Sequence, residues 1–503
     1  MDQELALAIL LSGKSALLTG AAGTGKTHLL NNFITQSRSL GKKVSVTATT
    51  GLAATHLNGN TIHSWSGLGI NDYLPDNFFE RLSKTRRELI EKTDILIIDE
   101  VSMLHDFRLD MLDEALRGIR GSEQPFGGIQ LVMSGDFFQL PPINRGNSRG
   151  GGFVVYSRAW QELQPVVLYL KHQYRQEEGE LLEILTALRS GDVRRRHAEK
   201  LLERTEATPK GDDITELHTV NVDVDKINSA RLAQLVGDEV SYSQMSTGSK
   251  VYVESLQRSV LAPEVLVLKR GALVMAVKNA ADRKYANGSI GTVVGFEPLT
   301  DYPIVEFRNG REVTMVPDTW ELRDGERKRA SISQIPLRLA WAITVHKSQG
   351  MTLDAAKIDL RRAFVEGMGY VALSRVRDIE NLYLYGINHK ALAVSPDALA
   401  IDEILDESSR QAAAEYEYLR SQIKDVLKNK PQPNKSSAWQ EKIANMRQTH
   451  PNAFRPWTAE QDSQLKEKFL SGLDIEALSR EMGRQPGSII IRLKKHFGED
   501  IIA

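Results

Sequence analysis

The chain has 503 residues, a formal net charge of −1 and a composition that is 41% hydrophobic and 26% charged. This length is too great for one core, so we expect several domains, and the balanced charge means that any nucleic-acid binding depends on local patches. The chain has no cysteine, which excludes disulfides, thiolate metal sites and cysteine nucleophiles.

The N-terminal segment MDQELALAILLSGKS lacks the positive charges and small-residue cleavage site of a signal peptide. No apolar run of the sequence is long enough to span a membrane. The absence of cysteine fits a reducing compartment. We therefore expect a cytoplasmic protein, associated with the nucleoid if it is bacterial, and no membrane partner.

Short apolar runs alternate with longer polar-periodic segments in the first third of the chain. The runs are SALLTG (15–20), KVSVTA (43–48), DILIIDE (94–100), IQLVMSGD (129–136) and VVLYL (166–170). This alternation predicts βαβ units and a parallel sheet. Similar runs at 213–220, 338–346, 355–360 and 382–387 suggest a second α/β lobe.

The pattern changes in the rest of the chain. Short strands divided by Asn287-Gly288 and Asn309-Gly310 predict hairpins of a small all-β insert between about 268 and 330. Residues 396–428 look like a long charged helix, and 428–437 has the composition of a linker. In the last fifty residues, a capping box of Thr458 and Gln461 begins the first of three predicted helices.

The stretch GAAGTGKTH (20–28) follows an apolar run and opens a helical segment. It fits the pattern G-x-x-x-x-G-K-[ST] in the strand–loop–helix context that confirms it. Its glycines let backbone N–H groups turn inward around an anion, a lysine reaches the β- and γ-phosphates, and a hydroxyl binds Mg²⁺. The predicted nucleotide-binding residues are Gly20, Ala21, Ala22, Gly23, Thr24, Gly25, Lys26, Thr27 and His28.

Acidic and amide side chains stand at the ends of two further predicted strands. Asp99 is expected in the Mg²⁺ shell, and Glu100 is expected to polarise the attacking water as a general base. Gln139, in GDFFQLPP, can donate to a phosphate oxygen and accept from a water, so it is a candidate γ-phosphate sensor. The alternative is that Gln139 only anchors its proline-stiffened loop.

Two arginines could neutralise charge that develops on the phosphates. Arg175 lies in HQYRQ, and Arg375 lies in GYVALSRVRD. The planar fork of arginine suits phosphate oxygens. For either arginine taken alone, a surface salt bridge is the better supported interpretation.

The ordered set of motifs resembles the Pif and RecD-like branch of the superfamily-one DNA helicases. The motifs are GAAGTGKT, TATTGLAA…GNTIHSWSG, ILIIDEVSML, PFGGIQLVMSGDFFQLPP, QYRQ, AITVHKSQGMTLD and GYVALSR. The segment 106–128 is similar to the signature of the Pif family, and the resemblance covers about residues 1–395. Gln3 falls where that family places the glutamine that reads adenine.

The resemblance implies an α/β fold of two RecA-like lobes, with ATP and Mg²⁺ in the cleft between them. It also implies 5′-to-3′ translocation on single-stranded DNA and unwinding of duplexes, in DNA repair, recombination or replication. Lys26, Thr27, Asp99, Glu100, Gln139, Arg175 and Arg375 would then form the ATPase site. One departure is Met368, where the family usually has a glutamine.

The same resemblance gives the expected division of the chain. The segments are lobe 1 (1–67 and 87–175), a wedge insert (68–86), lobe 2 (176–267 and 331–395), an SH3-like β insert (268–330), a long helix (396–428), a linker (429–450) and a three-helix domain (451–503).

Single-stranded DNA requires cationic or hydroxyl contacts to phosphates and aromatic faces for bases. Two motifs offer such groups, and the predicted contacts are Thr49, Thr50, His63, Ser64, Trp65, Thr344, His346, Lys347 and Ser348. Two alternatives stay open, because Trp65 could belong to the core and His63 could be a buried histidine with its hydrogen bonds satisfied. No histidine spacing suggests a zinc site.

The C-terminal segment resembles a helix-turn-helix or Myb-like fold. Arg492, Lys494 and Lys495 on its third helix suit phosphates, although a protein-docking role is nearly as well supported. Trp457 is expected in its core. We expect the chain to act as a monomer when it translocates, on single strands and duplex junctions, with a protein partner at the C-terminal domain.

Three functions compete with the helicase hypothesis. One is a DNA-stimulated ATPase that translocates without efficient unwinding. A second is an ATP-switched DNA-binding regulator, against which the complete set of hydrolysis residues counts. A third is a subunit of a nuclease complex, although the sequence shows no nuclease carboxylate cluster of its own.

Overall fold

The computed structural model describes residues 1–57, 59–69, 71–142, 144, 149–176, 178–209, 214–257, 260–280, 284–285, 287–308, 310–324, 327–421, 449–452 and 457–497. The chain divides into two compact units, Met1–Ser421 and Gln422–Ala503. Among the described helices, none combines the length and the apolarity that crossing a membrane requires.

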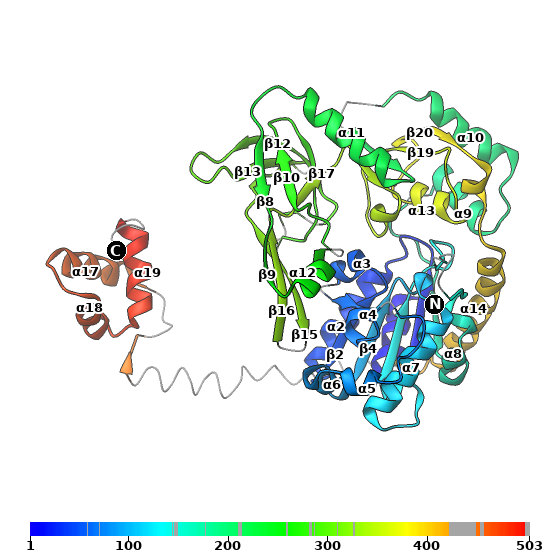
Figure 1. The fold of residues 1–503 in the computed structure, drawn as a ribbon, viewed down its shortest axis with the longest axis horizontal. Coiled ribbons are helices and arrows are strands. Elements are labelled where there is room, and N and C mark those ends of the chain that lie inside the picture. Colours follow the sequence, from blue (N-terminus) through cyan, green and yellow to red (C-terminus); the bar gives the residue numbers. More distant parts are fainter. Residues whose placement is uncertain are drawn as a thin grey trace. The chain divides into compact units, whose positions relative to one another are not determined.

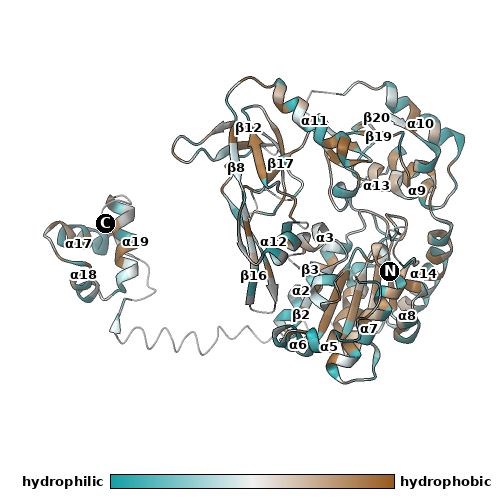
Figure 2. Cartoon of the chain, in the orientation of Figure 1, coloured by the Kyte–Doolittle hydropathy of each residue, from teal (hydrophilic) through white to brown (hydrophobic). Residues whose placement is uncertain are grey.

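A six-stranded parallel sheet forms the centre of the first lobe (Figure 1). Its strands lie in the order β3 (Asn60–Thr61), β2 (Val44–Ala48), β4 (Ile95–Asp99), β5 (Gln130–Ser134), β1 (Ala16–Gly20) and β6 (Val166–Leu170). The five predicted apolar runs are the five longer strands, and their parallel pairing is confirmed. Apolar side chains concentrate in these strands, while the surrounding helices also carry hydrophilic faces (Figure 2).

Helices precede and separate the strands of this sheet along the chain. They are α1 (Gln3–Leu11), α2 (Lys26–Ser39), α3 (Gly51–His56), α4 (Ile62–Ser66), α5 (Phe78–Arg81), α6 (Lys84–Glu91), α7 (Asp106–Arg120) and α8 (Arg158–Leu163). In α7 the buried leucines recur at helical spacing, at Leu109, Leu112 and Leu116. Gly121 ends α7 in the left-handed conformation, with φ 59°.

A four-stranded parallel sheet forms the second lobe, in the order β18 (Ala342–Thr344), β7 (Thr215–His218), β19 (Ala356–Leu360) and β20 (Leu382–Ile387). Its helices are α9 (Glu180–Arg189), α10 (Arg195–Glu206), α11 (Asn221–Gln234) and α13 (Met368–Leu373). The two sheets fit the two expected RecA-like lobes. The apolar run 338–346 is not one strand, however, because it passes from β17 (Leu337–Leu339) of the β insert into β18.

Antiparallel strands make up the β insert. A five-stranded sheet has the order β14 (Glu312–Thr314), β13 (Pro303–Phe307), β12 (Ile290–Phe296), β11 (Leu273–Ala276) and β17. A second sheet joins β15 (Asp318–Asp324), β16 (Arg327–Gln334) and β9 (Met245–Gly248), and β10 (Val265–Leu268) pairs with β8 (Val240–Ser243). Helix α12 (Lys250–Gln257) packs on β16. Pairing partners thus lie on both sides of 268–330, and the limits of this insert stay a prediction.

The helix predicted at 396–428 begins as α14 (Pro396–Glu415), and a turn follows it at Tyr416. Residues 422–448, which hold the end of that prediction and most of the linker, lie outside the described residues. The C-terminal unit has α17 (Ala459–Leu470), α18 (Ile475–Met482) and α19 (Pro486–Phe497) around a core of their own. Trp457 packs against this core, as predicted.

Candidate active site

The phosphate loop connects the end of β1 to the start of α2. Gly23 and Gly25 have φ values of 91° and 84°, a left-handed conformation that other residues rarely adopt. A Cβ atom at Gly23 would lie 2.2 Å from Oε1 of Gln173 and 2.6 Å from Cβ of Arg175. Glycine is therefore required here both for the backbone turn and for the close approach of the segment after β6.

Side chains of the loop hold its shape. The ammonium group of Lys26 donates to the carbonyls of Gly20 (2.9 Å) and Ala21 (3.0 Å). Burial lowers the pKa of Lys26, while Asp136 and Glu100 oppose this effect. Gln3 donates to the carbonyl of Thr24 at 3.3 Å, which places the expected adenine-reading glutamine directly beside the loop.

Glu100 follows β4 in a strained conformation. Its φ of 54° and ψ of 43° are left-handed, which costs a non-glycine residue on the order of 1–3 kcal/mol. Thr49 secures this turn, since its N–H donates to the carbonyl of Asp99 (3.1 Å) and its hydroxyl donates to that of Glu100 (2.9 Å). Burial and then the charge of Asp99 raise the pKa of Glu100 to about 7, and burial raises the pKa of Asp99.

Gln349 joins the two lobes and was missed by the sequence analysis. Its Nε2 donates to Oε2 of Glu100 (3.0 Å) and to Oε1 of Gln139 (3.2 Å). It immediately follows the short 3₁₀ helix His346–Ser348 of the second lobe. The motif HKSQG contains this residue, but the predicted contacts stopped at Ser348.

The two predicted arginines lie together at the cleft. Nη1 of Arg175 donates to the carbonyl of Ser374 (3.2 Å). Arg375 is buried, and its guanidinium donates to the carbonyls of Val371, Ser348 and Met351. Among the described residues neither guanidinium forms an ion pair. Burial and then the neighbouring Arg175 lower the pKa of Arg375 to about 9, as expected for two cations gathered where an anion binds.

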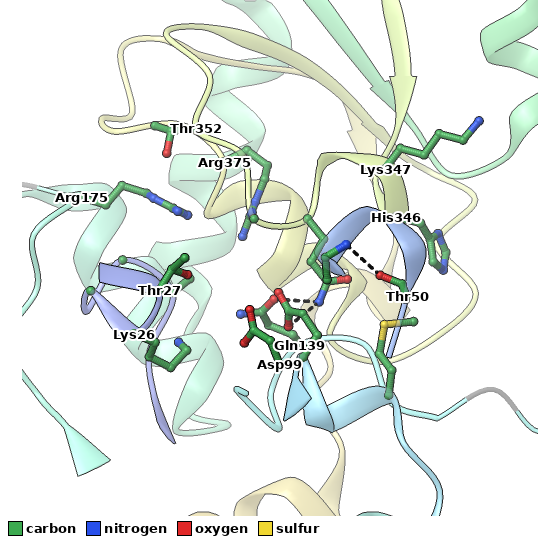
Figure 3. A pocket seen from close by; sticks show the side chains of 18 of the residues that line it. Lys26, Thr27, Thr50, Asp99, Gln139, Arg175, His346, Lys347, Thr352 and Arg375 are labelled. Carbon is green, nitrogen blue, oxygen red and sulfur yellow. Dashed lines mark hydrogen bonds between the residues drawn. The ribbon is translucent and has the colours of Figure 1, made fainter. Parts of the chain in front are cut away.

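One cavity of 1030 Å³ is lined by all seven predicted ATPase residues, together with Gln349. Figure 3 shows Arg175 and Arg375 on the side opposite Lys26, with Thr27 facing the space between them. His346 and Lys347 lie across the pocket from Lys26, beside Thr50 (Figure 3). The folding of two lobes thus brings residues 26 to 375 around one cleft.

The predicted DNA contacts divide into two groups. Thr50, His346 and Lys347 line the cavity, and the His346 ring stacks on the exposed Phe364 with centroids 6.2 Å apart. Thr344 and Ser348 are buried, and Ser348 donates to the carbonyl of Val345. Their hydroxyls therefore shape the segment instead of facing DNA.

Two aromatic positions are at least partly buried. Trp65 is 4% exposed within the hydrophobic core, so its expected role as a stacking surface is wrong. Burial and then Arg108 lower the pKa of His63 to about 4, which indicates a neutral, largely buried ring. Ser64, beside it, donates its N–H to Thr61 in the cap of α4. Met368 is fully buried at the start of α13 and does not line the cavity.

In the C-terminal unit, Arg492 forms an ion pair with Asp462 on α17 and lies 5.4 Å from the ring centroid of Trp457. Its guanidinium is therefore already engaged in contacts within the C-terminal unit, and not only available for a phosphate. The side chains of Lys494 and Lys495 lie outside the described residues.

The donor set suits a magnesium ion bound with a nucleotide. Thr27 offers a hydroxyl and Asp99 a carboxylate in the same cavity, and Mg²⁺ is usually held by one or two carboxylates together with substrate phosphates. Among the described residues, no group of three or more His, Cys, Asp or Glu side chains could hold a metal by itself.

Comparisons with known proteins identify the family of the chain. A family model described as PIF1-like helicase matches residues 2–193. The chain is 39% identical over 483 residues to the ATP-dependent DNA helicase Pif1 of Psychrobacter sp. (strain PRwf-1), which covers 84% of this chain and 73% of that protein.

Solved structures extend the likeness. The chain is similar to Bacteroides sp Pif1 in complex with ADP-AlF4, with a TM-score of 0.71 and 30% identity over 81% of this chain and 97% of that one. It is also similar to Bacteroides Pif1 in complex with ADP-AlF3 and ssDNA, with a TM-score of 0.61 and 31% identity over the same shares. With its phosphate loop, its cross-lobe arginines and these relatives, the chain belongs to the PIF1-like helicase family.

Proposed function

We propose that the chain is an ATP-dependent DNA helicase that moves 5′-to-3′ on single-stranded DNA and unwinds duplexes. The observation that carries this proposal is one cavity in which Lys26 and Glu100 of the first lobe face Gln349 and Arg375 of the second. A site divided between two lobes can change with each ATP cycle, and movement on a polymer requires such a change. Relatives named as ATP-dependent DNA helicases support the same function.

The hydrolysis step uses groups already positioned in the cleft. Backbone N–H groups of the loop and Lys26 bind the phosphates. Thr27 and Asp99 would hold a magnesium ion, which would neutralise phosphate charge when bound. Glu100 accepts the proton of the attacking water. Arg175 and Arg375 stabilise charge on the γ-phosphate as the second lobe closes.

Coupling to DNA runs through Gln349. This residue contacts both Glu100 and Gln139 and directly follows His346 and Lys347, which we propose as DNA contacts with Thr50. A shift of this segment on DNA moves the amide that holds the base and the sensor. Single strands and duplex junctions are therefore the proposed substrates, in repair, recombination or replication, with a monomer as the translocating species.

The test is ATP hydrolysis by the full chain with and without single-stranded DNA. We expect strong stimulation by DNA, and loss of hydrolysis in Lys26→Ala but not in Lys92→Ala, a surface lysine that follows α6. Equal rates of hydrolysis with and without DNA would contradict the proposed coupling between DNA binding and ATP hydrolysis. Tight, ATP-dependent DNA binding without turnover would instead favour the ATP-switched regulator.

A further inference from the structure

Arg189, the last residue of α9, is not among the predicted ATPase residues. It is buried between two carboxylates. Its side chain is 12% exposed, and its guanidinium donates to Oδ1 of Asp136 (2.6 Å) and Oδ1 of Asp402 (3.2 Å). The same group lies 4.2 Å from the ring centroid of Phe138. Since Asp136 is fully buried, it requires a counter-charge, and Arg189 supplies one in a fixed position.

The hydroxyl of Tyr370 connects this ion pair to the phosphate loop. It donates to Oδ2 of Asp136 (3.1 Å) and accepts from Arg189 (3.3 Å) and from the N–H of Ala22 (3.0 Å). A tyrosine hydroxyl has one proton and two lone pairs, so these contacts use its full capacity. The orientation of the Ala22 peptide in the loop therefore depends on a residue of α13 in the second lobe.

The sensor loop shares the same carboxylate. Asp136 accepts from the N–H of Phe138 (3.2 Å) and from Nε2 of Gln139 (3.4 Å). A Cβ atom at Gly367, just before α13, would lie 2.6 Å from the carbonyl oxygens of Phe138 and Gln139. The start of α13 is thus in direct contact with the sensor loop, and Asp136 lies between that loop and Tyr370.

The charge of Arg189 also affects Lys26. Burial alone would raise the pKa of Asp136, but Arg189 and Lys26 reverse this effect and lower it. If Arg189 were absent, Lys26 would be the remaining cation attracted by Asp136. Arg189 therefore leaves the ammonium group of Lys26 available for phosphate.

Helix α14 completes the cluster. Asp402 of α14 accepts from Arg189 and from the hydroxyl of Tyr169 (2.8 Å), and that hydroxyl accepts from Arg189 (2.8 Å). Ser409, two turns further along α14, accepts the N–H of Tyr169 (3.0 Å). The helix is thus bound to β6 beside the guanidinium.

We propose that Arg189 is a positioning residue of the nucleotide site, which orders the phosphate loop through Asp136 and Tyr370, and that α14 belongs to the catalytic unit because Asp402 holds Arg189 in place. The inference rests on the proposed function only in that the phosphate loop binds a nucleotide. It assigns no contact between Arg189 and the nucleotide itself.

The test compares Arg189→Lys with Arg120→Lys in the full chain. Arg120 is a structural arginine at the end of α7 that donates to the carbonyls of Gly127, Ile90 and Thr93, so both variants keep a charge and lose a fork. We expect Arg189→Lys to weaken MgADP binding about tenfold, the effect of losing one well-placed hydrogen bond. Arg120→Lys should lower the melting temperature and leave the MgADP Kd unchanged. Equal Kd values in the two variants would overturn the proposal.

Two further variants keep the proposal falsifiable if Arg189→Lys fails to fold. Tyr370→Phe keeps the ring and removes the hydroxyl, and we expect it to weaken MgADP binding; an unchanged Kd would overturn the role of the cluster.

Asp402→Asn should raise the KM for ATP more than it lowers kcat, whereas the exposed neighbour Glu403→Gln should change neither. Equal effects of these two variants would remove α14 from the catalytic unit. The MgADP Kd values of Arg189→Lys and Tyr370→Phe need neither DNA nor turnover, so their outcome is independent of whether the chain unwinds DNA.

Discussion

At the scale of single residues, the cleft holds Glu100 in a backbone conformation and an environment that both reduce stability. Glu100 is partly buried in a left-handed conformation beside Asp99. Such strain and desolvation reduce stability, and they persist where a reaction requires them. Thr49 holds the backbone carbonyl of Glu100, and Gln349 donates to its carboxylate in the cavity.

The first prediction concerns the role of Glu100 as general base. Glu100→Gln keeps the size and the contact with Gln349, so nucleotide binding should be retained, while turnover should fall on the order of 10²–10⁴-fold because the proton acceptor is lost. Single-turnover ATP hydrolysis and nucleotide titration measure the two effects separately. The exposed Glu114 of α7, changed to Gln, serves as the control. Normal turnover in Glu100→Gln would show that Glu100 does not accept the proton of the attacking water.

The second prediction concerns His63 and acid stability. Its pKa in the folded chain is about 4, below the ordinary histidine pKa of about 6.5, so the unfolded chain binds the proton first as the pH falls. The free energy of unfolding that depends on this neutral ring is therefore fully present above pH 6.5. It is lost as the pH falls towards 4, on the order of 3 kcal/mol in all. Denaturant unfolding of the parent and of His63→Gln between pH 7.5 and 5 should show a steeper loss in the parent. Parallel curves would contradict the assignment.

At the scale of elements, the apolar runs predicted the strands well because each run is short, buried on both faces and bounded by turn residues. The run 338–346 failed because two strands of different sheets meet within it, and the sequence carries no break between them. The prediction that Trp65 stacks on bases was wrong for a related reason. A motif fixes the position of a residue in the sequence, but it does not say whether the side chain lies in the core or on the surface.

The third prediction tests the phosphate loop as an element. Gly23 and Gly13 have nearly the same left-handed φ, 91° and 90°, but a Cβ at Gly13 meets nothing within 4 Å. Both alanine variants should lose about 1 kcal/mol of stability from backbone strain. Only Gly23→Ala should also abolish nucleotide binding, because its methyl group collides with Gln173 and Arg175. A nucleotide affinity equal in both variants would refute the steric argument.

At the scale of the whole molecule, the seven residues that the sequence predicted for the ATPase site all line one cavity. The motifs of the first lobe among them follow the ends of its strands. The sequence could not predict the contacts that join the lobes. Gln349 with Glu100, and Tyr370 with Ala22, are separated by hundreds of residues. Such contacts arise from lobe packing, which leaves no local pattern.

The fourth prediction concerns the C-terminal unit. Its helices have a core of their own around Leu478 and Ile489, and the catalytic cleft lies wholly within the first unit. A chain that ends at Ser421 keeps α14 and should hydrolyse ATP with the same DNA stimulation as the full chain. Loss of stimulation in the shortened chain would place a DNA contact in the last unit.

The most direct test of the central claim is strand separation by the full chain on duplexes that carry either a 5′ or a 3′ single-stranded tail, with ATP and Mg²⁺. The 5′-to-3′ polarity that the motif resemblance implies predicts unwinding of the 5′-tailed duplex only, and the role proposed for Glu100 predicts none in Glu100→Gln. Unwinding from the 3′ tail would contradict the polarity. Hydrolysis without separation of either duplex would contradict the helicase function and leave a translocating ATPase.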